Sequence, residues 1–243
     1  MRQTKLIILL IFMVIVSQCA KVNTPGGIVV WGSKDTTTVT FDYQNFNEII
    51  VSDKFHVTVK QGDEYAITVT TNQNLPDFLA IEKKYTVLMI GMKPNHFYKD
   101  AVLKATVTLP DLAYLDVNGM SAVEIVEFSP EFDLKIDVAE ASRLPGNLTA
   151  GNIDLTAKNG SDVTLTGRAD FLKAEGLVTC ELNMAEFSVS DANIYLSIGT
   201  QGIFTINGRL VAELRVGSDM KYFGNAVEEE VVKDESSSLT QQN

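Results

Sequence analysis

The stretch from residue 115 to 225 repeats one short pattern about six times, with starts about twenty residues apart. Each unit contains two runs in which apolar and polar residues alternate, such as Ile153/Leu155 followed by Val163/Leu165. Alternation with a period of two is typical of β-strands that bury one face. Two short strands cannot bury that face alone, so units of this kind must stack on one another.

The repeat therefore predicts an all-β fold, specifically a single-stranded right-handed parallel β-helix. A small residue stands at the start of each second run, where a corner needs room and unusual backbone angles. Cys180 occupies a position that serine fills in neighbouring repeats, so we interpret it as a small turn residue and not as a reactive thiol. The predicted structural turn residues are Ser121, Ser142, Ser161, Cys180, Gly202 and Ser218.

The first eighteen residues have the organisation of an export signal. Arg2 and Lys5 precede an apolar run over residues 6–16. This run of about eleven residues is too short to span a hydrocarbon core of roughly 30 Å. Residues 1–18 are therefore predicted to be a signal peptide of an exported protein.

Residues 16–19 resemble a bacterial lipobox, in which cleavage precedes a cysteine that receives a diacylglyceryl group. Cys19 is the predicted lipidation site. Gln18 departs from the lipobox pattern, which usually has a small residue directly before the cysteine. Acyl chains contribute roughly 0.8 kcal/mol per buried CH₂, so they would hold the protein to a membrane. The expected location is the periplasm or the outer membrane and cell surface. A plain secretory signal is the alternative.

The remaining chain divides by composition. Residues 19–40 contain Pro25 and a threonine run and predict a tether, in which Trp31 is expected to form an apolar lid on the first coil. Residues 41–225 are the predicted β-helical domain. The strands of residues 41–110 are expected to form its first, irregular coils, because no flexible linker separates them from the repeat; a separate small domain is the alternative. Residues 226–243 are rich in glutamate and serine and predict an acidic disordered tail.

The charge balance is acidic, with 31 Asp and Glu against 20 Lys and Arg and a net charge of −11. Binding to nucleic acid requires clustered cations that neutralise phosphates, and the chain has no basic stripe. The composition therefore argues against a nucleic-acid partner.

The sequence contains no evident catalytic constellation. Nucleophilic catalysis requires a base beside Ser or Cys, yet the two histidines are poorly placed: His56 alternates with apolar neighbours on a strand, and His96 lies in a polar turn. Polysaccharide-cleaving enzymes use pairs of carboxylates, but the candidate acids fall at different places within their repeats. These are Asp137, Asp154, Asp162, Asp170, Asp191 and Asp219. Calcium-binding β-roll motifs do not recur either, so no metal or cofactor is expected.

Three stretches in a fixed order, residues 46–62, 107–121 and 217–225, carry a family resemblance. Together they resemble the putative auto-transporter adhesin, head GIN domain family of exported bacterial proteins, over about residues 40–225. The resemblance implies a right-handed β-helical fold and export, but no proven activity. Residues 138–142 and 177–180 depart from the Ser-Gly-Ala-Ser turns of that family, so these turns are expected to be built differently.

We therefore predict an exported, lipid-anchored, non-enzymatic protein of the cell envelope that acts as an adhesin or interaction module. Its expected partners are the membrane, through the anchor, and a host or envelope protein or a glycan. The first alternative is a carbohydrate-binding or carbohydrate-active β-helix, which would need aromatic residues such as Phe97/Tyr98 or Tyr222/Phe223 in one groove. The second is a structural or assembly module whose coil ends pair into a homo-oligomer.

Overall fold

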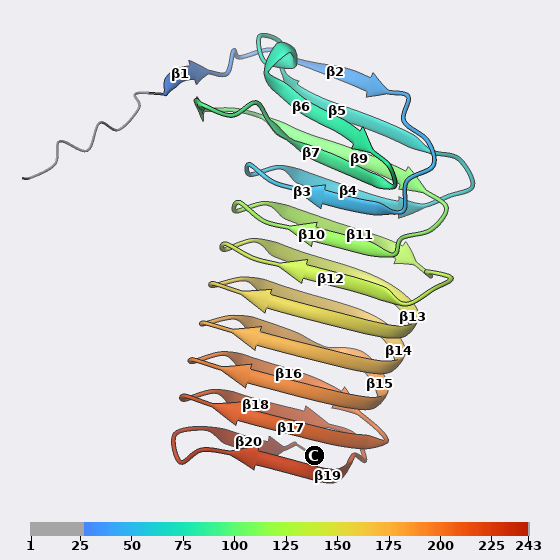
Figure 1. Ribbon diagram of the computed structural model, residues 1–243, viewed down its shortest axis with the longest axis vertical. Helices are drawn as coiled ribbons and strands as arrows, with labels where there is room; N and C mark the ends of the chain where they lie inside the picture. Colours follow the sequence, from blue (N-terminus) through green and yellow to red (C-terminus); the bar gives the residue numbers. More distant parts are fainter. Residues whose placement is uncertain (1–26, 243) are drawn as a thin grey trace, which may run out of the picture.

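A computed structural model describes residues 27–242, so the predicted signal peptide and the lipidation site Cys19 lie outside the described residues. The described chain is almost entirely β-structure and forms a solenoid of about seven turns of parallel stacked coils (Figure 1). The predicted parallel β-helix is therefore confirmed. Among residues 27–242, no helix is long and apolar enough to cross a membrane.

Each regular coil consists of two strands that lie on opposite sides of one apolar core. The chain advances by 18 to 21 residues per coil, as interactions between equivalent positions of neighbouring coils show. The strands are β1 (Ile28–Trp31), β2 (Thr36–Phe41), β3 (Glu48–Val51), β4 (His56–Gln61), β5 (Ala66–Asn72), β6 (Leu79–Lys84), β7 (Val87–Met92), β8 (His96–Lys99), β9 (Leu103–Leu109), β10 (Tyr114–Val117), β11 (Ala122–Phe128), β12 (Leu134–Val138), β13 (Arg143–Lys158), β14 (Asp162–Leu177), β15 (Glu181–Ser197), β16 (Gln201–Ile206), β17 (Arg209–Arg215), β18 (Asp219–Phe223), β19 (Val227–Lys233) and β20 (Ser238–Gln241).

The pairing register defines two opposing sheets. The first sheet runs in the order β6, β7, β3, β10, β12, the C-terminal halves of β13, β14 and β15, then β17 and β19. The second runs in the order β2, β5, β9, β4, β11, the N-terminal halves of β13, β14 and β15, then β16, β18 and β20. Alternate residues of both sheets point inward, so Val163, Leu165 and Leu172 are buried, as their alternation predicts.

One edge of the solenoid is a column of tight turns, which we call the turn column. Seven of these turns place two successive residues at positive φ, a conformation that glycine and asparagine adopt most easily. The pairs are Asp53/Lys54, Gly119/Met120, Glu140/Ala141, Asn159/Gly160, Val178/Thr179, Ile198/Gly199 and Val216/Gly217. Backbone hydrogen bonds continue through the column, for example from Gly160 N to Val178 O at 3.0 Å.

The N-terminal end combines coils with strands that reverse direction. β3 and β4 form one coil and β7 and β9 another, and both run parallel to their neighbours. β5 then pairs antiparallel with β9, β2 with β5, and β6 with β7. These strands share one continuous hydrophobic cluster with the repeat.

Residues 27–40 differ from the predicted tether, because β1 and β2 occupy most of them. Trp31 is also not a lid on the first coil. It lies in β1, which pairs in parallel with β8 as a separate two-stranded ribbon, and its side chain is exposed. The reason is the register: Trp31 lies opposite the exposed Lys99, on the ribbon face that points away from the core.

The predicted disordered tail is wrong for the described residues 226–242. β19 pairs in parallel with β17, and β20 pairs in parallel with β18, so this segment forms the last coil. Four residues supply its packing: Ser237 is buried, and Ala226, Val231 and Leu239 pack against the core. The glutamates that made the composition resemble a disordered segment are on outward or edge positions.

Candidate binding surfaces

The predicted turn residues gather in one buried column beside the turn column, with one exception. Ser121, Ser142, Ser161, Cys180 and Ser218 occupy equivalent positions, and neighbouring coils are linked there by bonds such as Ser121 N to Ser142 Oγ at 3.1 Å. The exception is Gly202, which pairs with Leu182 inside β16. The corner position of that coil belongs to Thr200, whose Oγ1 accepts a hydrogen bond from Cys180 N at 3.4 Å.

Gly202 fails as a turn residue because it lies two residues beyond the corner residue Thr200, at an inward position of β16. Its lack of a side chain serves the core instead. A Cβ atom there would lie 2.5 Å from the ring of Phe204, so glycine makes room for that aromatic side chain.

Cys180 is a buried member of the column. Its Sγ lies 3.3 Å from the carbonyl oxygen of Leu177, three residues earlier. The hydroxyls of Ser161 and Ser218 donate to the equivalent carbonyl oxygens in their own coils, those of Lys158 and Arg215. The thiol therefore replaces a serine hydroxyl geometrically and is not exposed to a ligand.

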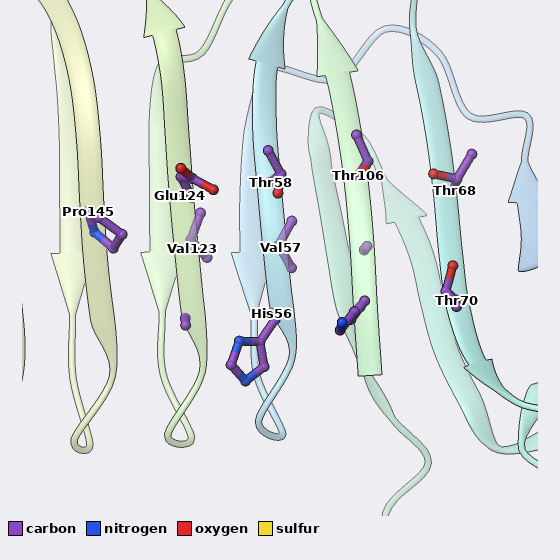
Figure 2. A pocket seen from close by; sticks show the side chains of 12 residues that line it. His56, Val57, Thr58, Thr68, Thr70, Thr106, Val123, Glu124 and Pro145 are labelled. Carbon is purple, nitrogen blue, oxygen red and sulfur yellow. The ribbon is translucent and has the colours of Figure 1, made fainter. Parts of the chain in front are cut away.

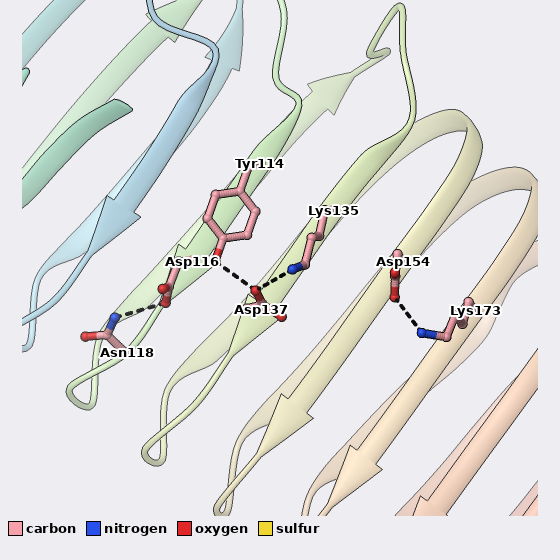
Figure 3. Close-up of polar contacts among 7 residues, drawn as sticks. All are labelled: Tyr114, Asp116, Asn118, Lys135, Asp137, Asp154 and Lys173. Atoms are coloured by element: carbon pink, nitrogen blue, oxygen red, sulfur yellow. Dashed lines mark hydrogen bonds and ion pairs between the residues drawn. The ribbon is translucent and has the colours of Figure 1, made fainter. Parts of the chain in front are cut away.

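The outer face of the first sheet carries a ladder of charged and polar side chains (Figure 3). Tyr114 donates its hydroxyl hydrogen to Asp137 Oδ2 at 2.8 Å, and Lys135 lies 3.5 Å from the same carboxylate. In the next two coils, Lys173 Nζ of β14 lies 3.6 Å from Asp154 Oδ1 of β13 and 2.9 Å from Glu175 Oε1 of its own strand. Burial and the hydrogen bond to Asp137 raise the pKa of Tyr114, and the hydrogen bond to Glu175 raises the pKa of Lys173. Two lysines therefore offset part of the charge of three carboxylates along the sheet.

The other candidate catalytic groups stay apart. His56 lies on the outer face of β4, and His96 lies in β8 beside Phe78, with ring centroids 5.2 Å apart. Asp162 pairs with Arg143 on the second sheet, whereas Asp191 accepts a hydrogen bond from Arg209 N at the opposite corner. Within residues 27–242, no three His, Cys, Asp or Glu side chains gather as metal ligands would.

A hollow of about 420 Å³ lies on the outer face of the second sheet, near its N-terminal end. Thr58, Thr68 and Thr106 lie opposite one another on β4, β5 and β9 and present their side chains on the same side (Figure 2). Glu124 and His56 lie beside this row, and Lys104 also lines the hollow. We call this surface the threonine face. It offers hydroxyl groups of both donor and acceptor character together with opposite charges.

A second hollow, of about 600 Å³, lies between β8 and the turns that follow β3 and β10. Phe97 and Tyr98 line it with Met120, so one of the predicted aromatic pairs does border a cleft. The other pair does not, because Tyr222 is buried and donates to Glu228 Oε1 at 2.6 Å. Burial and this hydrogen bond raise the pKa of Tyr222 to about 12.

Comparison with known proteins identifies the family. The family described as putative auto-transporter adhesin, head GIN domain, matches residues 45–226. The chain belongs to this family. The matched residues include the threonine face and all seven turns of the turn column, whereas β1, β2 and most of the last coil lie outside the match.

Solved structures with this fold are similarly organised. A putative adhesin from Bacteroides fragilis superimposes with a TM-score of 0.78 at 16% sequence identity, covering 88% of this chain and 100% of that chain. A putative adhesin from Parabacteroides merdae gives a TM-score of 0.67 at 13% identity, covering 89% of this chain and 100% of that chain. No curated protein matches the chain. These similarities establish the head GIN domain fold and leave the ligand to be argued from the surface.

The sequence did not predict which surfaces of this head GIN domain are hollowed. The threonines of β5, β9 and β4 come from three separate segments, and only their register aligns Thr68, Thr106 and Thr58. A signal was available in the repeated Thr-Val-Thr pattern at residues 68–70 and 106–108, which puts polar side chains on one face of each strand.

Proposed function

We propose that this protein is an exported, lipid-anchored and non-enzymatic adhesin of the cell envelope, held to the membrane through Cys19. The observation that carries the proposal is the solenoid itself. About seven coils at about 4.8 Å per coil make one continuous body about 35 Å long, which displays outward side chains on two broad sheets. Membership of the head GIN domain family and the lipobox-like sequence before Cys19 support the same conclusion.

The charge ladder of the first sheet supports display over catalysis. Its carboxylates are paired with lysines or with a tyrosine hydroxyl, so their charges serve the sheet surface. A glycosidase would instead hold one carboxylic acid with a raised pKa opposite a second carboxylate.

The anchor is tested by expressing the full chain and the Cys19→Ser variant in a Gram-negative host. For the wild-type protein, mass spectrometry of the membrane fraction is expected to show a chain that begins at Cys19 and carries acyl groups. For Cys19→Ser, the acylated species should disappear. An unmodified wild-type chain, or an identical mass shift in both proteins, would overturn the lipid anchor.

The adhesin role is tested by presenting the lipidated protein to extracellular-matrix proteins and to a glycan array. A reproducible protein or glycan ligand, without turnover of that ligand, is the expected result. Cleavage of any glycan by the purified protein would overturn the non-enzymatic role.

The threonine face favours a glycan as a second candidate function. A row of hydroxyls flanked by Glu124, His56 and Lys104 matches a polar ligand that is itself rich in hydroxyls. The double variant Thr68→Val/Thr106→Val removes two hydroxyls and keeps the shape of the side chains. It should lose glycan binding, whereas Thr164→Val, on the same sheet further along the stack, should retain it. Equal binding by both variants would exclude this face.

A further inference from the structure

The ribbon formed by β1 and β8 carries a concentrated exposed apolar surface, which we call the head patch. It consists of Val29, Trp31, Phe97 and Met120, whose side chains are 46%, 57%, 60% and 57% exposed. Val29 lies opposite Phe97, and Trp31 lies two residues further along β1, so all three point to the same side of the ribbon. Met120 borders the same cleft as Phe97 from the turn column.

The head patch is held rigidly although it is exposed. On the opposite face of the ribbon β8 packs on the body, where the ring of Phe78 lies 5.2 Å from His96 and 5.9 Å from Tyr98, whereas Ile28 of β1 is exposed. Asn74 Nδ2 donates to Trp31 O at 2.8 Å, and Gly32 N donates to Lys99 O at 2.9 Å. A fixed apolar face that nothing covers within residues 27–242 is typical of a docking surface.

The chemistry of the head patch matches the interface between lipid and water. Tryptophan and other amphipathic aromatic residues concentrate at the headgroup level of membranes, and lysine stems extend toward the headgroups. Lys99 Nζ lies 5.0 Å from the centroid of the Trp31 ring, and Lys54 borders the cleft. Two acids share this cleft: Asp53 accepts hydrogen bonds from Ser52 Oγ and Met92 N, and Asp100 is exposed.

The position of the patch in the chain favours a membrane over another partner. Ile28, the first residue of β1, follows Cys19 by nine positions. A fully extended chain advances at most about 3.6 Å per residue, so this connection reaches about 32 Å at most. An acylated Cys19 therefore confines β1 to the neighbourhood of the bilayer, whatever the path of the intervening residues.

We propose that the head patch docks onto the lipid interface of the membrane that anchors the protein. This inference rests on the proposed lipid anchor and adds a second contact to it. A diacylglyceryl group supplies two acyl chains, which suffice for stable attachment, so docking adds an orientation to an attachment that is already stable. Docking would fix the orientation of the solenoid, which attachment through one residue alone cannot do.

Trp31 is the only tryptophan of the chain, so its fluorescence reports on the patch directly. The lipidated full chain is reconstituted in vesicles of phosphatidylethanolamine and phosphatidylglycerol, with and without brominated acyl chains. Docking predicts a blue shift of the emission, quenching by the brominated lipid and protection from acrylamide. The variants Phe97→Ser and Val29→Ser should lose these effects while still floating with the vesicles. Val227→Ser, which changes an exposed apolar residue at the far end, should retain them.

The two proposals fail separately in this experiment. Vesicle-bound, acylated protein whose Trp31 emission is not quenched would overturn docking and leave the anchor intact. Absence of acyl groups with quenched Trp31 would overturn the anchor and support docking. Protection of Trp31 in intact cells but not in lipid vesicles would overturn docking in favour of a protein partner.

Discussion

The two ends of the solenoid stop the stacking of strands in different ways. At the N-terminal end, β2 and β6 run antiparallel to their neighbours and form the last strand of the second and the first sheet, respectively. At the C-terminal end, β19 and β20 run parallel like every coil before them, and within residues 27–242 no strand pairs with their outer edges. There the edge is rich in charge, with Glu228, Glu229 and Glu230 in β19. Charged residues on an edge strand discourage pairing with another chain. The N-terminal end therefore stops with strands of reversed direction, whereas the C-terminal end stops with a regular coil whose edge carries charge.

Both ends border one continuous hydrophobic core. A charge placed in the middle of this core is expected to have the largest effect on stability. Val163 is fully buried, so Val163→Asp places a carboxylate among stacked apolar side chains. We expect it to cost about 4 kcal/mol or more and to unfold both ends together, as measured by chemical denaturation and hydrogen exchange. Thr164→Lys, at the adjacent exposed position, should be nearly silent. Unfolding of one end alone would show that the core is divided.

The N-terminal end depends on a buried amide. Asn72 Nδ2 donates to Ser33 O at 2.6 Å, and its Oδ1 accepts from Val102 N at 2.7 Å, so this residue joins three segments. Asn72→Ala removes both bonds and leaves buried partners unpaired, which should cost about 2 to 3 kcal/mol. Thermal or denaturant unfolding measures the loss. Asn147→Ala, at an exposed position with one hydrogen bond to Thr166, should lower the free energy of unfolding by only about 0.5 kcal/mol. We call Asn72 with its two hydrogen bonds the Asn72 clamp, and equal losses in the two variants would refute its role.

The turn column also differs between the two halves of the molecule. Its first positive-φ position is held by Asp53, Gly119, Glu140 and Asn159 toward the N-terminal end, but by Val178, Ile198 and Val216 toward the other. A β-branched residue in this conformation is strained.

Ile198→Asn and Val216→Asn recreate the Asn-Gly pair already present at Asn159 and Gly160, which suits a turn with two positive φ values. Each should stabilise the fold by about 1 kcal/mol, seen as a higher melting temperature. The reciprocal Asn159→Val should lower it. A lower melting temperature for Ile198→Asn and Val216→Asn, or a higher one for Asn159→Val, would show that the exposed apolar side chains at these turns stabilise the fold by packing.

The smallest predicted effect concerns the last coil and acid. The Val216 N–H, with additional bonds from Ser237 and Ser236, lowers the pKa of Asp234 from 3.8 to about 2. Because the native pKa lies below the unfolded value, the carboxylate stabilises the coil above about pH 4, and this contribution is lost as the pH falls toward 2. Hydrogen exchange should therefore show opening of β19 and β20 between pH 4 and 2. Asp234→Asn should remove this pH dependence, and an unchanged profile would contradict it.

The sequence predicts the regular part of the molecule because strand alternation is a local property. The inward positions of β13 and β14 follow directly from residue spacing, as do the corner residues from Ser121 to Cys180. Gly202 was misplaced because threonine replaced serine at the next corner and the coil length changed. The sequence does not predict the last coil, because few inward residues (Ala226, Val231, Ser237 and Leu239) supply its packing among many charges.

The candidate surfaces could not be predicted in the same way, because they depend on distant pairings. β1 finds its partner β8 nearly seventy residues later, and β5 inserts beside β9 after a separate excursion of the chain. The aromatic pair Phe97/Tyr98 was a predicted site feature, but its cleft exists only because the turn at Gly119 and Met120 lies beside it.

The Asn72 clamp has a mechanical consequence for a protein that is pulled by its N-terminus. Tension that arrives from residue 27 reaches the four-residue pairing of β1 with β8 first, and this ribbon lies outside the main sheet. The clamp at Ser33 stands between that ribbon and β2. Under load β1 can therefore separate from β8 and lengthen the connection, while the hydrogen bonds of Asn72 carry the force before it reaches the hydrophobic interior. An adhesin built in this way would absorb a sudden pull at its base before its ligand-bearing surfaces deform.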